Sequence, residues 1–265
     1  MGEGTISSGV DVWVKRTRLP VIDGFYARKN YHEDAGQGLD DYQVGRSRGC
    51  GGIGIWNGGR LFSPINFKSA RIISSGPVRS EFELTFQAWD AGGRKVSETR
   101  TISIDAGSNM SRVESVFSSS DPTPLEVAVG IAERADPSAT LARDEPKGWM
   151  AYWQAPDRDR GSIGCAVVLG AGRVLGFKED SASVPQPPAE KRLVPGIEGL
   201  PPVANALAIT EARVGEPLTY YLGAGWSRSG DFADAGEWEA YVARFAERTA
   251  WPLRATVNLS RIAPP

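Results

Sequence analysis

The sequence has little of what would indicate a membrane or a nucleic-acid partner. It contains no run of the roughly 18 apolar residues that a membrane-spanning helix needs. It has no basic surplus, because 30 Lys and Arg residues are balanced by 32 Asp and Glu residues and the net charge is −2. The segment Met1–Thr5 has no positive region followed by an apolar core, so we predict no signal peptide in this chain. We therefore expect neither a membrane nor a nucleic acid as a partner, and the oligomeric state stays open.

Cysteine and histidine are also scarce. The two cysteines, Cys50 and Cys165, are far apart and match no metal-binding or redox spacing. We expect two free and mostly buried thiols; a disulfide is the alternative if the fold brings them together. The only histidine is His32. Tryptophan, by contrast, occurs eight times, and a few of these rings in an all-β protein could stack on sugars.

What the sequence has in abundance is alternation of polar and apolar residues, which is typical of half-buried strands. The segment 80–89 alternates cleanly, and a turn at 90–94 leads to its expected antiparallel partner at 96–105. A second hairpin is predicted around Asn57-Gly58-Gly59. Further strands are expected at 10–15, 53–56, 60–62, 67–75, 109–117, 125–131, 148–154, 161–169, 172–178, 203–210, 216–225 and 253–259.

One segment, 234–248, has the spacing of an amphipathic helix, with Asp234 as its N-cap. Residues 181–202 are rich in proline and are expected to form a long loop. More than ten strands with short turns and one late helix predict an all-β fold, a large antiparallel β-sandwich. We expect a single domain over residues 1–265.

The polar stretch between Asn30 and Cys50 is the candidate active-site segment. It gathers His32, two tyrosines, two arginines and four carboxylates, and its glycines interrupt any regular helix. We expect it to be a loop that lines the main pocket. At least two of four side chains, those of His32, Tyr42, Arg46 and Arg48, should face inward. The predicted catalytic residues are His32, Tyr31, Tyr42, Arg46 and Arg48, and the predicted substrate-binding residues are Lys68, Asp34, Asp40, Trp56 and Trp226.

Two reactions use such groups. In β-elimination on a uronic acid, a base removes the proton next to the carboxylate, a cation stabilises the developing enolate, and a histidine or tyrosine protonates the leaving oxygen. In glycoside hydrolysis, two carboxyls flank the bond, and the segment has enough of them. No cofactor is expected. Ca²⁺ is the cation that this acidic segment would accommodate, although a solvated loop without metal is the favoured interpretation.

Two motifs in this segment, Tyr31-His32-Glu33-Asp34 and 44–52, resemble a bacterial family known only as domain of unknown function four-eight-six-one. The resemblance continues through Asn66-Phe67-Lys68, 75–79, 105–109 and 225–231. Genes of this family often accompany genes for degrading pectin and other uronic-acid polysaccharides. The resemblance implies a supersandwich like that of galactose mutarotases and a periplasmic or secreted location. Family members are longer before Val10, so we expect this chain to be N-terminally short relative to its family.

Three functions follow from these observations. The leading hypothesis is a carbohydrate-active enzyme that acts on oligosaccharides containing uronic acid, by β-elimination or by hydrolysis. A sugar epimerase or mutarotase is the second hypothesis. A non-catalytic carbohydrate-binding module that uses tryptophans such as Trp56, Trp153 or Trp226 is the third.

Overall fold

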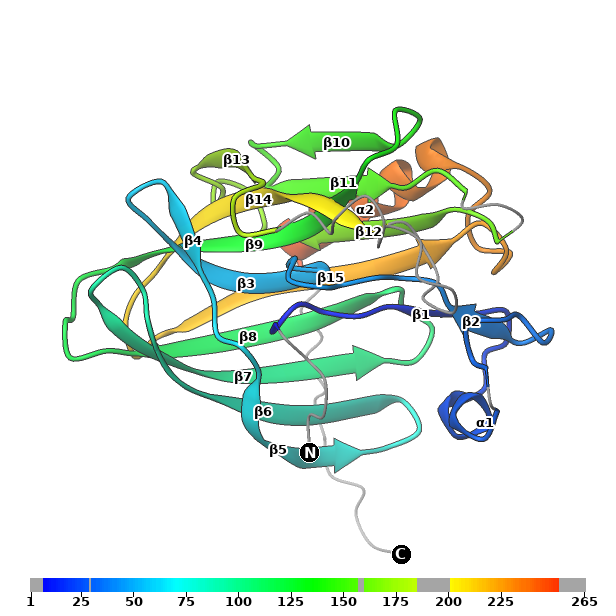
Figure 1. Cartoon of the computed structure of the whole chain (residues 1–265), viewed down its shortest axis with the longest axis horizontal. Coiled ribbons are helices and arrows are strands. Elements are labelled where there is room, and N and C mark those ends of the chain that lie inside the picture. Colours follow the sequence, from blue (N-terminus) through cyan, green and yellow to red (C-terminus); the bar gives the residue numbers. More distant parts are fainter. Residues whose placement is uncertain (1–6, 29, 157–159, 185–200, 253–265) are drawn as a thin grey trace, which may run out of the picture.

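The computed structural model describes residues 7–28, 30–156, 160–184 and 201–252. Two antiparallel sheets pack face to face and enclose the main hydrophobic core, as Figure 1 shows. The predicted antiparallel β-sandwich is therefore confirmed. The larger sheet has eight strands, in the order β10 (Thr140–Asp144), β11 (Trp149–Trp153), β12 (Ile163–Val168), β15 (Pro217–Trp226), β8 (Met110–Ser118), β7 (Lys95–Asp105), β6 (Arg79–Asp90) and β5 (Phe67–Ser75).

The smaller sheet covers the middle of the larger one. Its five strands lie in the order β13 (Gly176–Asp180), β14 (Pro202–Ala212), β9 (Leu125–Arg134), β3 (Cys50–Asn57) and β4 (Arg60–Phe62). Strands β9 and β14 are buried on both faces and almost free of charge in their middle, which explains their long apolar runs. The hairpin from β3 to β4 turns at the predicted Asn57-Gly58-Gly59.

The predicted late helix is also confirmed. Helix α2 (Ala235–Ala250) begins after Asp234, whose carboxylate accepts a hydrogen bond from the Glu237 amide at 3.0 Å. It places Trp238 and Val242 against the outer face of β11 and β12 and forms a second apolar layer there. The predicted strand at 253–259 and most of the predicted proline-rich loop lie outside the described residues.

Three elements were not predicted. Strand β10 continues the larger sheet beyond β11, and a short helix, α1 (Ile22–Tyr26), buries Phe25. Strand β2 (Gly38–Asp40) lies inside the segment expected to be irregular and pairs with β1 (Trp13–Lys15). This two-stranded ribbon lies at one end of the sandwich, next to α1 (Figure 1).

Both cysteines are free and buried in the core, as expected. Cys50 donates to the carbonyl oxygen of Gly223 at 3.1 Å. Burial raises the pKa of the Cys50 thiol well above its ordinary value. The Cys50 thiol is therefore not poised to act as a nucleophile.

Candidate functional site

The ribbon of β1 and β2 has one apolar side and one side rich in aromatic and titratable groups. Val14 pairs with Leu39, and both are buried in the main core. Trp13 pairs with Asp40, and because directly opposed residues share a side, these two lie on the other side of the ribbon. The expectation that the whole segment is a loop was wrong, because β2 pairs with β1 and this pairing alternates its side chains between core and surface.

His32 and Asp40 form a close pair on this second side. The Nδ1 atom of His32 lies 3.1 Å from the carbonyl oxygen of Asp40 and 3.5 Å from its carboxylate. With its proton on Nδ1, the ring donates to that carbonyl and keeps Nε2 as an acceptor. Both side chains keep some solvent contact, with 25% of His32 and 14% of Asp40 exposed. The structure thus brings together two residues that the sequence analysis had placed in a site.

An aromatic stack orients this pair. The ring of Tyr31 is 4.5 Å from the His32 ring and stacks on Trp13 at 4.9 Å. Trp13 also stacks on Phe25, with the two ring centres 5.7 Å apart. The stack fixes the direction of the imidazole, because aromatic rings in contact resist rotation in a packed cluster. Tyr31 therefore has a positioning role in the structure; its predicted catalytic role stays a prediction.

Two carboxylates of the site have raised pKa values. Burial raises the pKa of Asp40 to about 6, and the nearby negative charge of Asp11 adds to the effect. Asp11 is an exposed residue, but protein atoms crowd its carboxylate, and this desolvation raises its pKa too. The Asp11 carboxylate accepts from the indole nitrogen of Trp13 at 2.9 Å and from the amide of Val12 at 2.8 Å. A carboxyl group with a pKa near 6 can transfer protons close to neutral pH.

Two predicted catalytic residues are structural instead. Arg48 is only 2% exposed, and its guanidinium donates to the Ser8 hydroxyl at 3.1 Å and to the Ile53 carbonyl at 3.3 Å. Gly130 makes room for it, because a Cβ atom there would lie 2.6 Å from Arg48 Cγ. Tyr42 is 4% exposed and belongs to the main core. Assigning direct substrate contact to these two side chains was wrong, because neither has surface to offer.

The other predicted site residues are spread over the molecule. Arg46 is exposed next to this end of the sandwich, and Lys68 is exposed on β5, the edge strand of the larger sheet. Asp34 is engaged by the Arg16 side chain and by the amides of Gly36 and Gly38, and these contacts lower its pKa despite partial desolvation. It therefore serves to close the turn before β2. The structure does not bring Arg46, Lys68 and Asp34 together.

The two predicted tryptophans differ in their burial. Trp226 is 2% exposed, its indole nitrogen donates to the Arg160 carbonyl at 2.9 Å, and the Arg16 guanidinium lies 4.9 Å from its ring centre. Trp56 is half-buried and packs on a small apolar cluster that contains Leu207. Arg16 lies over the ring of Trp226, although Trp226 is among the residues that line the cavity described next. A substrate-binding role for Trp56 stays a prediction.

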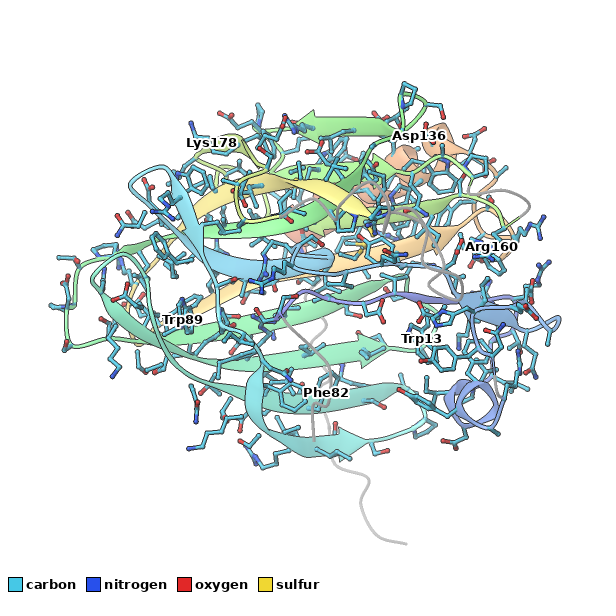
Figure 2. All side chains as sticks on the ribbon, in the orientation of Figure 1. Trp13, Phe82, Trp89, Asp136, Arg160 and Lys178 are labelled. Atoms are coloured by element: carbon cyan, nitrogen blue, oxygen red, sulfur yellow. The ribbon has the colours of Figure 1, made fainter. Side chains whose placement is uncertain are left out.

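A cavity with a volume of about 930 Å³ lies between residues 10–18 and one end of the larger sheet. Its wall includes Asp11, Trp13 and Cys50, and its far side is formed by the 105–109 turn and Asp231. Figure 2 shows Trp13 and Arg160 at the end of the sandwich that carries β1 and β2, with Trp89 at the opposite end. None of His32, Tyr42, Arg46 and Arg48 lines this cavity. The prediction that the 31–48 segment lines it was wrong, because β1 lies between that segment and the cavity.

Most charged groups on the cavity wall are already paired. Arg18 pairs with Asp231, Arg79 pairs with Asp105, and the Lys15 ammonium donates to the Leu19 carbonyl at 3.0 Å. Asp11 is the cavity carboxylate whose hydrogen-bond donors are neutral. Asp11 and Trp13 therefore connect the cavity wall with the His32–Asp40 pair. The sequence analysis predicted no site role for either residue. Their only signal was the strand pattern at 10–15, which carries no functional information.

Within the described ranges, no three His, Cys, Asp or Glu side chains come together as a set of metal ligands. Neither α1 nor α2, the helices of the described part of the chain, combines the length and apolar character needed to cross a bilayer.

The family of this protein is established by comparison. A family model described as a domain of unknown function, DUF4861, matches residues 4–255, and the chain belongs to that family. A protein of Formosa agariphila named Uncharacterized protein P7 is 30% identical over 260 residues. The match covers 96% of this chain and 60% of that protein, so the chain spans well under two thirds of its relative's length.

Two solved structures show weak similarity. One is a putative aldose 1-epimerase from Klebsiella pneumoniae, with a TM-score of 0.37 and 9% identity over 80% of this chain and 68% of that chain. The other is the galactosidase domain of alpha-galactosidase-sucrose kinase, with a TM-score of 0.29 and 8% identity over 81% of this chain and 35% of that chain. Likenesses at these TM-scores carry no argument about substrate or reaction.

Proposed function

We propose that this protein is a carbohydrate-active enzyme that cleaves oligosaccharides containing uronic acid, by β-elimination in the cavity beside β1. The observation that carries the proposal is a proton-transfer cluster that reaches the cavity wall at Asp11 and continues to Asp40 and His32 on the other side of β1. Asp11 faces the cavity, Asp40 has a pKa of about 6, and His32 contacts Asp40. Carboxyls with raised pKa values next to an imidazole are the groups that general acid–base catalysis uses.

The size of the cavity is consistent with a sugar substrate. A volume of about 930 Å³ falls within the range of roughly 300–1,000 Å³ that is common for small-molecule sites. The wall combines an aromatic ring, Trp13, with polar groups such as Asn109 and Ser111. Sugars present both apolar C–H faces and hydroxyl groups, so a mixed wall of this kind is complementary to them.

Elimination fits the cluster better than hydrolysis does. A glycosidase needs two carboxyls that flank the scissile bond. The cavity carboxylates opposite Asp11 are Asp105 and Asp231, and arginines hold both of them in ion pairs. Elimination needs one base and one acid next to a group that neutralises the substrate carboxylate. Asp11 at the cavity wall can act on the substrate, and Asp40 and His32, on the other side of β1, can exchange protons with it.

A binding module that stacks sugars on tryptophan is less well supported. The Arg16 guanidinium lies over the Trp226 ring, and Trp13 is stacked on Tyr31 and Phe25. Sugar stacking also requires no proton transfer, so the pKa of about 6 at Asp40 would have no role in a module of that type.

The proposal is tested with a panel of oligosaccharides made of galacturonate, glucuronate or their neutral counterparts. Elimination produces a conjugated double bond that absorbs ultraviolet light, whereas hydrolysis produces reducing ends without that absorbance. We expect absorbance to rise with the uronic substrates alone. Reducing ends without absorbance would replace elimination by hydrolysis, and a change of sugar configuration without cleavage would indicate an epimerase.

Variants assign the roles. We expect Asp11→Asn, Asp40→Asn and His32→Ala each to slow turnover by about 10²–10⁴ while the fold is kept. The matched control is Asp90→Asn at the opposite end of the sandwich, where the side chain accepts from the amides of Gly92 and Gly93. Full activity in all three cluster variants would refute the proposed site.

A further inference from the structure

The charged side chains on the cavity wall are evenly divided between the two signs. Among the described residues that line the cavity, three are acidic and three are basic, namely Asp11, Asp105, Asp231, Lys15, Arg16 and Arg18. Four of these six form ion pairs with other side chains. The four are Asp105, Asp231, Arg16 and Arg18. One anion and one cation of the wall therefore stand outside these pairs, Asp11 and Lys15.

Lys15 is the wall cation that has no carboxylate partner within the described part of the chain. Its ammonium group donates to the carbonyl oxygen of Leu19 at 3.0 Å, and the residue is exposed. An ammonium group has three N–H donors, so two of them can be given to a ligand. Because the carbonyl is neutral, the positive charge of Lys15 stays uncompensated by the protein at this point of the cavity wall.

The strand pairing leaves space around the Lys15 side chain. Lys15 is the last residue of β1, and Gly38 of β2 lies directly opposite it. Directly opposed residues share a side of a sheet, and Gly38 has no side chain, so β2 places none next to the lysine stem. A larger residue does not fit at Gly38, because a Cβ atom there would lie 2.0 Å from the carbonyl oxygen of Val14. The flexible stem of Lys15 can therefore move its ammonium group within the cavity.

Asp11, Trp13 and Lys15 form a row along β1. Side chains alternate along a strand, so Trp13 and Lys15 share a side, with their Cα atoms about 7 Å apart. The indole nitrogen of Trp13 in turn donates to the Asp11 carboxylate at 2.9 Å. All three residues line the cavity. The row thus has a carboxylate at one end, an aromatic ring in the middle and an ammonium group at the other end.

We propose that Lys15 binds the carboxylate of a uronic sugar in this cavity, with the ring carbon next to that carboxylate directed toward Asp11. This inference rests on the proposed function and deepens it, because it names the cation that elimination needs. Positive charge at the substrate carboxylate stabilises the negative charge that develops when the neighbouring proton is removed. The sequence analysis gave this role to Arg46 or Arg48. Lys15 has the access to the cavity that Arg48, at 2% exposure, does not have.

The first test compares galacturonate with its methyl ester, which keeps the sugar ring and removes the charge. Calorimetry measures the binding of both sugars to the unmodified protein and to Lys15→Gln. A single sugar has no glycosidic bond to cleave, so binding is measured without turnover. We expect the unmodified protein to bind the acid about 10- to 100-fold more tightly than the ester, the usual contribution of a hydrogen bond between charged groups. Lys15→Gln should bind the two forms about equally tightly.

The matched control is Lys178→Gln. Lys178 is also an exposed lysine on a strand, β13, and Figure 2 shows it far from Trp13. We expect this variant to keep the full preference for the acid. The proposal would be overturned by the same preference in Lys15→Gln, or by an equal loss of affinity for acid and ester in that variant. It would also be overturned if the unmodified protein bound neither galacturonate nor glucuronate, or bound galactose 6-sulfate and no uronate.

The second test varies the salt concentration and the cation. Salt screens the attraction between charges that are in contact with solvent. Added salt should therefore weaken the binding of galacturonate to the unmodified protein, with little effect on the ester or on Lys15→Gln. Lys15→Arg keeps a positive charge and should recover most of the preference for the acid together with its salt dependence. Binding of the acid that does not respond to salt in any of these proteins would contradict the proposal.

These tests separate the inference from the proposed function. Binding of galacturonate through Lys15 without cleavage of any uronic oligosaccharide would support this site and refute the enzyme. Cleavage of uronic oligosaccharides by Lys15→Gln, with the preference of the unmodified protein for the acid over its methyl ester, would refute this site and leave the enzyme standing.

Discussion

Arg100, in the middle of β7, and Arg134, the last residue of β9, are two buried arginines, and the difference between them is informative. Both are buried, and both lie over an aromatic ring, Phe86 at 4.6 Å for Arg100 and Tyr42 at 4.5 Å for Arg134. Only Arg100 has a carboxylate partner, Glu98. Burial lowers the pKa of Arg100, but the Glu98 charge outweighs this and holds it above its ordinary value. The middle of the larger sheet is therefore electrostatically complete, whereas the end of the smaller sheet beside the cavity is not.

The largest effect expected from this comparison comes from breaking the complete pair. Glu98→Gln should destabilise the protein by about 3–5 kcal/mol, because it leaves Arg100 buried with an uncompensated charge. Denaturant unfolding followed by circular dichroism measures this loss. The control is Glu83→Gln on the adjacent strand, where the pair with the exposed Arg71 should contribute less than about 1 kcal/mol. Equal losses in the two variants would contradict the comparison.

A smaller and pH-dependent effect is expected at Asp40. Its pKa is raised from 3.8 to about 6 in the folded state, so the folded protein holds this proton more tightly than the unfolded chain does. The protonated group is favourable below about pH 4, and this contribution is lost as the pH rises to 6. Asp40→Asn should therefore stabilise the protein by about 2 kcal/mol at pH 7.5 after allowance for solvent screening, and by much less at pH 4. Thermal unfolding of both proteins across this range measures the difference, and a gain that is larger at pH 4 would reverse the assignment.

The hydrogen bonds that complete the Arg100 site should have a moderate effect. The buried Ser115 hydroxyl donates to the Glu98 carboxylate at 2.7 Å. Ser115→Ala removes a donor to a buried charge and should cost about 1–2 kcal/mol. Ser69→Ala, at an exposed hydroxyl pair with Thr85, is the control and should change the unfolding free energy by less than about 0.5 kcal/mol.

The smallest effect on stability is expected at the incomplete site. Arg134→Met keeps a long side chain over Tyr42 and removes a charge that has no partner. The unfolding free energy should change by less than about 1 kcal/mol in either direction, since the lost cation–π contact offsets the relieved burial of charge. A loss of 3 kcal/mol or more, as expected for Glu98→Gln, would mean that Arg134 is as much a structural residue as Arg100.

Much of the fold could be predicted from the sequence. The alternation at 80–89 and 96–105 corresponds to β6 and β7, and the capped amphipathic segment corresponds to α2. These predictions succeeded because side-chain period is a local property that burial on one face imposes directly. Strand β2 escaped notice because it has three residues and pairs with a segment more than twenty positions earlier. Short strands are defined by their partners and not by their own pattern.

The site was predicted only in part, for a related reason. His32 and Asp40 meet as neighbours in the predicted segment, but Asp11 comes close to them because the adjacent strand β1 pairs with β2. Polar residues in a glycine-rich segment look alike in a sequence whether they face solvent or core. Arg48 is buried because Gly130 of β9 leaves space for it, and that contact lies 82 positions away in the chain. The sequence therefore identified the region of the site but not which arginine is buried without a partner.

The position of β15 has a consequence for the order in which the chain can assemble. In the larger sheet, β15 lies between β8 and β12, and it pairs with both over most of its length. During synthesis the chain emerges from its N-terminus at about 5–20 residues per second, so β8 and β12 are complete before their common partner exists. Until Pro217–Trp226 arrives, both of these strands present unpaired backbone edges of the kind that associate with other chains. The last strand to be made in the described sheet is thus the one that joins its two halves and covers both of these edges.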